Sequence, residues 1–275
     1  MNDPQVQWLA DGRLHLHHGP MDLICQAWGE AGAVRSGYDR AIARFATVLE
    51  ELVAELPALR AEKQSLNGAL ALKMSDAVAP FRPRFITPMA AVAGAVADEI
   101  LTHLAVPGVL RAYANNGGDL ALHLGVGEAL VCALAQGGQV RVSAKMPVRG
   151  IATSGWRGRS WSLGIADAVT VLARTGAMAD AAATMIANAV DLPDHPAIQR
   201  RPAVEMQADS DLGARLVTVD VGPLTPAEIA CALDRGLAAA QGFAAQGLIE
   251  GAALFLQGQV RTHGAMTLPK ESELA

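Results

Sequence analysis

Two predicted helices carry faces made of very small side chains, and this feature limits the fold more than any other. The helices are expected over residues 89–104 (MAAVAGAVADEILTHL) and 176–190 (GAMADAAATMIANAV). Their small faces, with members four residues apart, are Ala90, Gly94 and Asp98 in the first and Ala179, Ala183 and Ala187 in the second. Residues at this spacing share one side of a helix. We therefore expect both faces to be packed tightly, with backbones in close approach.

The composition fits such packing. The chain has 275 residues, of which 51% are hydrophobic but only 4% aromatic, and 27 are glycine. A chain of this length can bury a large core. With few large side chains, that core depends on close backbone contact. We expect a single domain over 1–275, with two lobes at about 1–146 and 147–275 as the alternative division.

The local patterns predict an α+β protein. Residues 5–28 alternate as a short strand meander, and 109–146 return to strands. Ser36, with Asp39 three residues later, predicts the start of a helix. The stretch MSDAVAPFRPRFITP (74–88) contains three prolines and predicts an extended surface loop. Near the end of the chain, TPAE predicts a capped helix over about 226–241.

Charge and composition exclude several classes of protein. The formal net charge is −5, from 27 acidic and 22 basic residues, and no basic stripe is present, which argues against a nucleic-acid partner. The longest apolar run, 88–97, is too short to span a bilayer. No signal peptide is visible at the N-terminus, and the three cysteines are widely spaced. We expect a soluble, cytoplasmic protein that does not enter a membrane.

The stretch AYANNGGDLALHL (112–124) is the first candidate site. Five residues that disfavour strands lie between two good strand halves: Asn115, Asn116, Gly117, Gly118 and Asp119. One interpretation is a tight hairpin, because Asn-Gly and Gly-Gly are favoured two-residue turns. The other is a backbone bent for close approach of a ligand, with Asp119 at the rim.

A second candidate is the loop TSGWRGRSWSLG (153–164). Ser154 and Gly155 can point backbone N–H groups inward, and Arg157 and Arg159 can add bidentate donors. Together they would cradle a phosphate. The alternative is a solvated hairpin whose arginines face water.

A third candidate is the pair Asp180 and Thr184. At positions i and i+4, a carboxylate and a hydroxyl share one helix face and suit a hard cation such as Mg²⁺. Alternatively, Asp180 is an exposed acid that meets the helix dipole, and Thr184 bonds to its own backbone. No GxSxG, Walker or Rossmann motif supports a hydrolase, kinase or dehydrogenase.

Several motifs recur in an order that resembles a known family. ANNGGDLAL, GIATSG, GRSWSLGIADAVTVLA and ADAAATMIANAV resemble the ApbE superfamily of FAD:protein FMN transferases, and in particular its uncharacterised prokaryotic ApbE-like branch. The resemblance covers roughly residues 13–192. It implies an α+β fold related to the T-fold, with antiparallel sheets and helices packed on one side. Two strand-then-helix units, near 80–146 and 148–221, suggest an internal pseudo-duplication.

The resemblance also implies a cofactor site. In the transferases, a sequence like GGD borders the flavin, and the ligand is FAD or a related flavin nucleotide. The Asp and Thr of an A-D-A-x-A-T helix hold Mg²⁺ together with a backbone carbonyl. Carried to this chain, the metal positions are Asp180, Thr184 and Ala95.

The chain departs from the transferases at two points. The family's His-x-x-Asp-Pro-x-Thr-Gly stretch is here SWSLGIAD, and its Lys-Gly after Gly-Ala-x-Ala is here Asp98-Glu99. No catalytic residue is therefore assigned, and the sequence does not decide whether the protein is an enzyme.

Three functions follow from the resemblance. The first is an ApbE-like protein that binds a small anionic ligand, a flavin or a nucleotide, with Mg²⁺ and without FMN transfer. The second is an active Mg²⁺-dependent transferase acting on an acceptor protein. The third is a non-catalytic assembly or sulfur-assimilation factor with a partner protein. A homodimer is one oligomeric state that the sequence leaves open.

Overall fold

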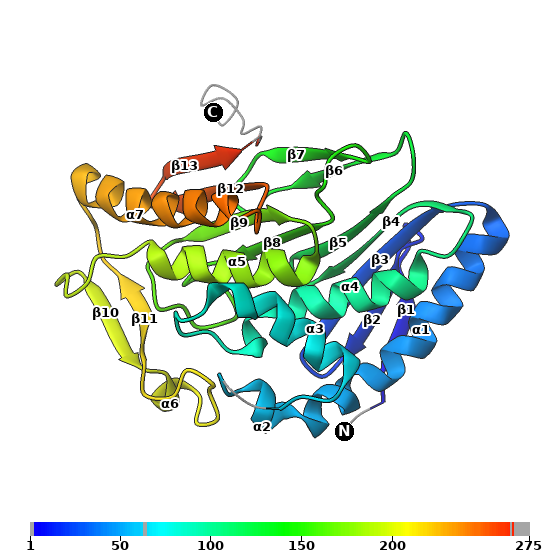
Figure 1. Ribbon diagram of the computed structural model, residues 1–275, viewed down its shortest axis with the longest axis horizontal. Helices are drawn as coiled ribbons and strands as arrows, with labels where there is room; N and C mark the ends of the chain where they lie inside the picture. The colour runs from blue at the N-terminus through cyan, green and yellow to red at the C-terminus, as the bar shows by residue number, and fades with distance from the viewer. Residues whose placement is uncertain (1–2, 63–64, 265, 267–275) are drawn as a thin grey trace. The chain divides into compact units, whose positions relative to one another are not determined.

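The computed structural model describes residues 3–62, 65–264 and 266, and its elements are labelled in Figure 1. The chain divides into two compact units. Unit 1 contains the described residues within Met1–Val131, Arg141–Ala152 and Ala173–Asp180. Unit 2 contains those within Cys132–Val140, Thr153–Leu172 and Ala181–Ala275.

Unit 1 is built on an antiparallel sheet. Its strands, in spatial order, are β1 (Gln5–Trp8), β2 (Leu14–His18), β3 (Met21–Gly29), β4 (Val109–Asn116), β5 (Asp119–Leu124) and the first part of β8 (Gly150–Ser154). Neighbouring strands from β1 to β8 pair antiparallel. The predicted meander over 5–28 is confirmed.

Helices cover one face of this sheet. Along β3, Met21, Leu23 and Cys25 are buried while the residues between them are partly exposed, as expected for a strand with one covered face. Helix α1 (Ala31–Ala54) packs on β2 and β3, and α4 (Val92–Leu104) packs on β4 and β5. Figure 1 shows α4 crossing in front of these strands.

The predicted helix start at Ser36 is wrong. Helix α1 begins at Ala31 with Glu30 at the N-cap position, and the Glu30 backbone N–H donates to the carbonyl of Gly108 at 2.9 Å. Gly37 lies so close to α4 that a Cβ there would be 2.3 Å from the Leu104 carbonyl oxygen. Tertiary contacts of this kind, rather than the local capping pattern, fix where α1 begins.

The predicted extended loop over 74–88 is wrong over 74–81, whereas 82–87 contain neither helix nor strand. Before Pro80 the chain forms α2 (Leu56–Leu59) and α3 (Ala69–Val78), and two short 3₁₀ turns follow, η1 (Ala79–Phe81) and η2 (Pro88–Ala91). The buried side chains of α3 include Leu70, Met74 and Val78, at helical spacing. The prolines end the helix instead of preventing it.

Unit 2 contains a smaller antiparallel set of strands. β9 (Ala168–Ala173, to Leu172 in this unit), β12 (Gly251–Leu256) and β13 (Gln259–Gly264) are neighbours in that order, and α7 (Pro226–Ala245) packs on β12 and β13. The strands β10 (Ile198–Pro202) and β11 (Leu216–Val221) form a separate antiparallel pair. The short helix α6 (Ala203–Met206) lies between them in the sequence.

Three elements remain, the strands β6 (Ala129–Ala133) and β7 (Gln139–Ser143) and the helix α5 (Gly176–Ala189). The strands β6 and β7 form a two-stranded sheet of their own. Helix α5 begins in unit 1 and continues in unit 2. Ala179, Ala183 and Ala187 on α5 are fully buried, as the small-residue face predicts.

The predicted α+β class with antiparallel sheets is confirmed. The predicted capped helix near 226–241 is confirmed as α7, with the complete capping box of Thr225 and Glu228. Within the described residues, no helix is both long and apolar enough to cross a membrane.

Candidate functional site

In unit 1, the beginnings of α4 and α5 lie directly against each other. A Cβ added at Gly94 would be 2.1 Å from the carbonyl oxygen of Gly176, and one added at Gly176 would be 2.8 Å from that of Gly94. Only glycine leaves room for this contact, since real Cβ atoms do not come so close to backbone oxygens. The predicted tight packing of the Gly94 face is confirmed here.

Asp98 of α4 caps the N-terminus of α5. Its carboxylate accepts hydrogen bonds from the backbone N–H groups of Gly176, at 2.8 Å, and Ala177, at 2.9 Å. The Thr175 hydroxyl accepts the next one, from Met178 at 3.1 Å. Three of the N–H groups that a helix start leaves without intrahelical partners are thereby satisfied.

Asp180 of α5 makes the reciprocal contact with α4. Its Oδ2 accepts a hydrogen bond from the Gly94 N–H at 3.0 Å. Each helix thus supplies a carboxylate to the positive end of the other helix dipole. The two caps hold the paired helix starts together.

The carboxyl groups at this place have raised pKa values. Burial raises the pKa of Asp98 to about 6, against the opposing effect of its two backbone N–H bonds. Asp180 keeps a partly accessible surface, yet loss of hydration is the largest cause that raises the pKa of this carboxyl group well above its ordinary value. The negative charges of Asp119 and Asp98 raise it further, and the backbone N–H groups of Gly94 and Ala93 oppose the shift. Such a site favours a cation or a proton.

The stretch 115–119 forms the turn of the β4–β5 hairpin. Asn116 pairs with Asp119 across the turn, and Gly117 and Gly118 have positive φ angles of 64° and 117°. Asn115 Oδ1 accepts a hydrogen bond from the Gly118 N–H at 2.9 Å. The hairpin interpretation is confirmed, because two left-handed residues are what a two-residue turn of this kind requires. The ligand-rim role stays a prediction.

Two members of this turn are tied to the helix pair. The buried Asn116 donates from Nδ2 to the Ala93 carbonyl at 3.2 Å and accepts from the Asp22 N–H at 3.3 Å. Asp119 is only 8% exposed, and its charge acts on Asp180. The structure therefore brings Asn116, Asp119 and Asp180 together in unit 1.

The predicted metal ligands are distributed over both units. Asp180 and the fully buried Ala95 belong to unit 1, whereas Thr184 belongs to the part of α5 in unit 2. Across residues 3–62, 65–264 and 266, no three His, Cys, Asp or Glu side chains converge on a point that could hold a metal ion. The metal site stays a prediction, and it needs ligands other than carboxylates alone.

The predicted anion loop lies in unit 2. Both of its arginines are exposed, and the Nε of Arg157 donates to Asp167 Oδ1 at 3.0 Å. Ser154, partly exposed, is the last residue of β8, and Gly155 is buried. Because the 115–119 turn belongs to unit 1, a pocket shared by the turn and this loop stays a prediction.

Sequence reasoning missed the role of Asp98, which it treated as a substitute for a lysine beside an anion. Its neighbour Glu99 is turned to other helices, where it binds Arg44 Nε at 2.8 Å and Lys73 Nζ at 2.5 Å. A signal was available, because Gly-Ala-x-Ala-Asp occurs twice, at 94–98 and 176–180. The repeated segments are the two that cap each other.

Comparison with known proteins now places the chain. A family model described as AbpE bacteria matches residues 6–262. The chain belongs to this ApbE-like family. A UPF0280 protein of Methanopyrus kandleri is 35% identical over 181 residues, which cover 62% of this chain and 71% of the relative. One of Methanothermobacter thermautotrophicus is 33% identical over 165 residues, 57% of this chain and 58% of that protein.

The ApbE-like chain spans little more than half of the second relative's length. Among solved structures, the apo flavinyl transferase ApbE of Pseudomonas stutzeri is similar over 96% of both chains, at 14% identity and a TM-score of 0.42.

Proposed function

We propose that this ApbE-like protein binds a flavin nucleotide of the FAD type through a Mg²⁺ ion at the start of α5. The proposal is carried by the state of Asp180. Its carboxyl group is only partly accessible to water and lies in the field of Asp119 and Asp98, with backbone N–H groups as the opposing positive influence. A divalent cation beside this carboxylate would offset that negative charge. The motifs shared with FAD:protein FMN transferases support a flavin as the ligand.

The oxygen donors fit the proposed ion. Asp180 Oδ2 bonds to the Gly94 N–H, and the carboxyl group also interacts with the Ala93 N–H, so a cation would share its oxygens with these two groups. Thr184 follows one helical turn later on α5. Ala95 lies within α4, where its carbonyl keeps a second lone pair beside its helical hydrogen bond. Three protein oxygens leave about three positions of an octahedral Mg²⁺ for water or phosphate oxygens.

We assign the remaining ligand contacts to the 115–119 turn and to the loop over 154–159. The 115–119 turn would border the flavin, and Ser154, Gly155, Arg157 and Arg159 would receive its phosphates. A cation held by one carboxylate binds weakly without an anionic partner. We therefore expect Mg²⁺ and ligand to bind together.

Calorimetry with FAD, with and without Mg²⁺, tests the proposal. Wild-type protein is expected to bind FAD only with Mg²⁺, and Asp180→Asn is expected to abolish that binding. Asp234→Asn, an exposed aspartate on α7 paired with Arg261, is the matched control and should bind like wild type. Equal, metal-independent binding in all three proteins contradicts the proposal.

A second function, transfer of FMN to a protein, remains an alternative because Asp180 and Thr184 match the metal-binding motif of the transferases. Transfer of FMN from FAD releases AMP, so AMP formation upon incubation with FAD, Mg²⁺ and a cell lysate distinguishes transfer from binding. The chain lacks the His-x-x-Asp-Pro-x-Thr-Gly stretch. We therefore expect Mg²⁺-dependent FAD binding without AMP release, as a ligand-binding assembly or sulfur-assimilation factor would also show.

A further inference from the structure

A tight turn in unit 2 presents a tryptophan and an arginine side by side. The segment Gly155-Trp156-Arg157-Gly158 is closed by a hydrogen bond from the Gly158 N–H to the Gly155 carbonyl at 3.0 Å. A Cβ at Gly155 would be 2.5 Å from the Asp167 carbonyl oxygen, so the turn is pressed against the chain at 166–167. The turn is therefore fixed in place by backbone contacts.

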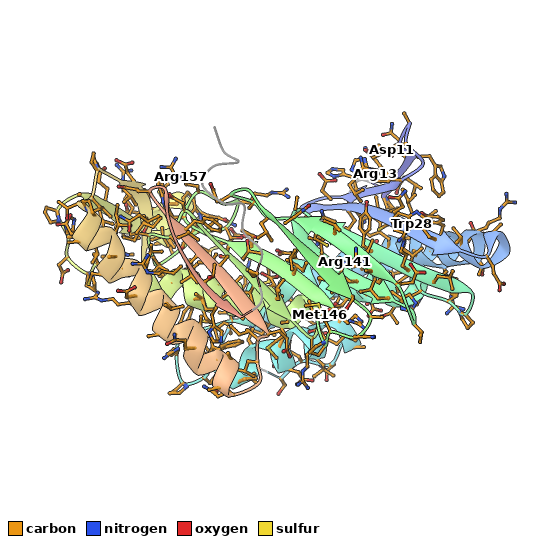
Figure 2. All side chains as sticks on the ribbon, turned by 90° about the horizontal axis from the view of Figure 1, so that it is seen from above. Asp11, Arg13, Trp28, Arg141, Met146 and Arg157 are labelled. Carbon is orange, nitrogen blue, oxygen red and sulfur yellow. The ribbon has the colours of Figure 1, made fainter. Side chains whose placement is uncertain are left out.

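The two central side chains are stacked. The guanidinium carbon of Arg157 lies 4.7 Å from the centroid of a Trp156 ring. A planar cation over an indole is a favourable contact, and it holds the guanidinium in one plane. Arg157 is one of the residues labelled in Figure 2.

Asp167 binds both side chains of the stack. Its Oδ1 accepts from Arg157 Nε at 3.0 Å and from Trp156 Nε1 at 3.3 Å. Its Oδ2 accepts from the Gln257 backbone N–H at 2.6 Å. With a side chain only 15% exposed, Asp167 is itself held in place.

The stack leaves one edge of the arginine available. Within the described part of the chain, Asp167 and the Trp156 ring are the partners of Arg157, and neither contact uses Nη1 or Nη2 as donor. The side chain is 61% exposed. Two parallel N–H donors on a fixed guanidinium match the oxygens of a phosphate group.

We propose that Asp167 is a positioning residue that orients the Trp156–Arg157 stack, so that Nη1 and Nη2 of Arg157 bind a phosphate group of the ligand. This inference rests on the proposed function and specifies how its ligand is recognised. It requires the guanidinium to be oriented, rather than merely charged.

The test uses inorganic pyrophosphate in the presence of EDTA, so that no metal takes part. Binding is followed by the indole N–H signal of Trp156 in NMR spectra, identified by its loss in Trp156→Phe. Arg157→Ala is expected to weaken binding by about tenfold or more, as for loss of a charge-assisted pair of hydrogen bonds. Arg157→Lys, which keeps the charge without the planar fork, is expected to bind as weakly as Arg157→Ala.

Asp167→Asn separates orientation from charge. This change removes a negative charge next to Arg157, so charge alone predicts tighter pyrophosphate binding. Orientation by Asp167 predicts weaker binding, on the order of tenfold, and no further loss when Asp167→Asn is added to Arg157→Ala. If Asp167→Asn does not fold, Arg157→Lys alone decides the question.

Two results overturn the inference. One is tighter binding by Asp167→Asn, and the other is binding by Arg157→Lys that equals wild type. Wild-type protein that binds Mg²⁺ and FAD but no pyrophosphate overturns this inference and leaves the proposed function standing. Pyrophosphate binding that depends on Arg157 and Asp167, without Mg²⁺-dependent FAD binding, overturns the proposed function alone.

Discussion

The start of α7 and the start of α5 are both capped by a carboxylate, yet the pKa values of the two acids are shifted in opposite directions. At α7, Glu228 accepts hydrogen bonds from Thr225, by its backbone N–H and its hydroxyl, and from His195, and these contacts lower its pKa to about 2. At α5, Asp98 accepts two backbone N–H bonds, and its pKa is nevertheless raised to about 6. Both carboxylates accept hydrogen bonds at a helix start, so the opposite pKa shifts arise from the different hydration of the two groups.

The comparison shows why only one of these ends suits a cation. The Glu228 side chain is 36% exposed, so its charge stays solvated and its hydrogen bonds outweigh the small opposing effect of desolvation. Asp98 and Asp180 are only partly accessible to water, and the loss of hydration outweighs the N–H groups that they cap, so the pKa of each carboxyl group is raised. The exposed cap stabilises a helix. The buried pair stabilises two helices and also leaves negative charge unbalanced.

The largest effect is expected from Gly94→Ala. The new methyl group would lie 2.1 Å from the Gly176 carbonyl oxygen and 2.7 Å from the Ala177 nitrogen, so the two helix starts must separate. We expect a loss of at least about 3 kcal/mol in unfolding free energy, measured by urea denaturation. Gly32→Ala in α1 is the control, because nothing lies within 4 Å of its added Cβ. A Gly94→Ala protein as stable as that control would contradict the close approach.

The next effect concerns pH and Asp98→Asn. Because the folded pKa of Asp98, about 6, exceeds its ordinary value of 3.8, its contribution is fully present below pH 3.8 and is lost as pH rises through 6. We expect the stability of wild type relative to Asp98→Asn to fall by about 3 kcal/mol over that window. Urea denaturation of both proteins at several pH values measures this. An unchanged difference would show that burial does not dominate at Asp98.

A smaller effect is expected at the exposed cap. Thr225→Ala removes the hydroxyl that accepts from the Glu228 backbone N–H and should lower stability by about 1 kcal/mol. Since the pKa of Glu228 is depressed, its contribution is present above the ordinary value of 4.5 and is lost only as pH falls through about 2. The effect of Thr225→Ala should therefore be constant between pH 5 and 8, in denaturation experiments like those on Asp98. A strong pH dependence in that range would break the contrast between the two caps.

The smallest effect on stability is expected from Arg157→Ala. Its ion pair with Asp167 is largely exposed on the arginine side, and such pairs contribute only about 0–1 kcal/mol. We expect a change in unfolding free energy below about 0.5 kcal/mol, measured by the same denaturation assay. A much larger loss would mean that Arg157 is chiefly structural.

The sequence by itself determined the elements whose signals are local. The alternation of β2 and β3, the Gly117–Gly118 hairpin turn and the capping box of α7 are each encoded within a few consecutive residues. Such signals act through the backbone of the same segment, and at these three places no tertiary contact overrode them, unlike at the predicted helix start at Ser36. The small face of α5 was readable for the same reason, since residues four apart always share a helix side.

Only the tertiary structure decided how α4 and α5 cap each other. Asp98 and Gly176 are 78 residues apart, and Gly94 and Asp180 are 86 apart. No local pattern states that these groups meet, although the repeated Gly-Ala-x-Ala-Asp hinted that they are equivalent. The same holds for the pKa of Asp98 and Asp180, because the loss of hydration that raises it comes from packing of distant segments. The sequence shows which charged and hydrogen-bonding groups the chain has, whereas only the fold determines how far these groups lose their hydration.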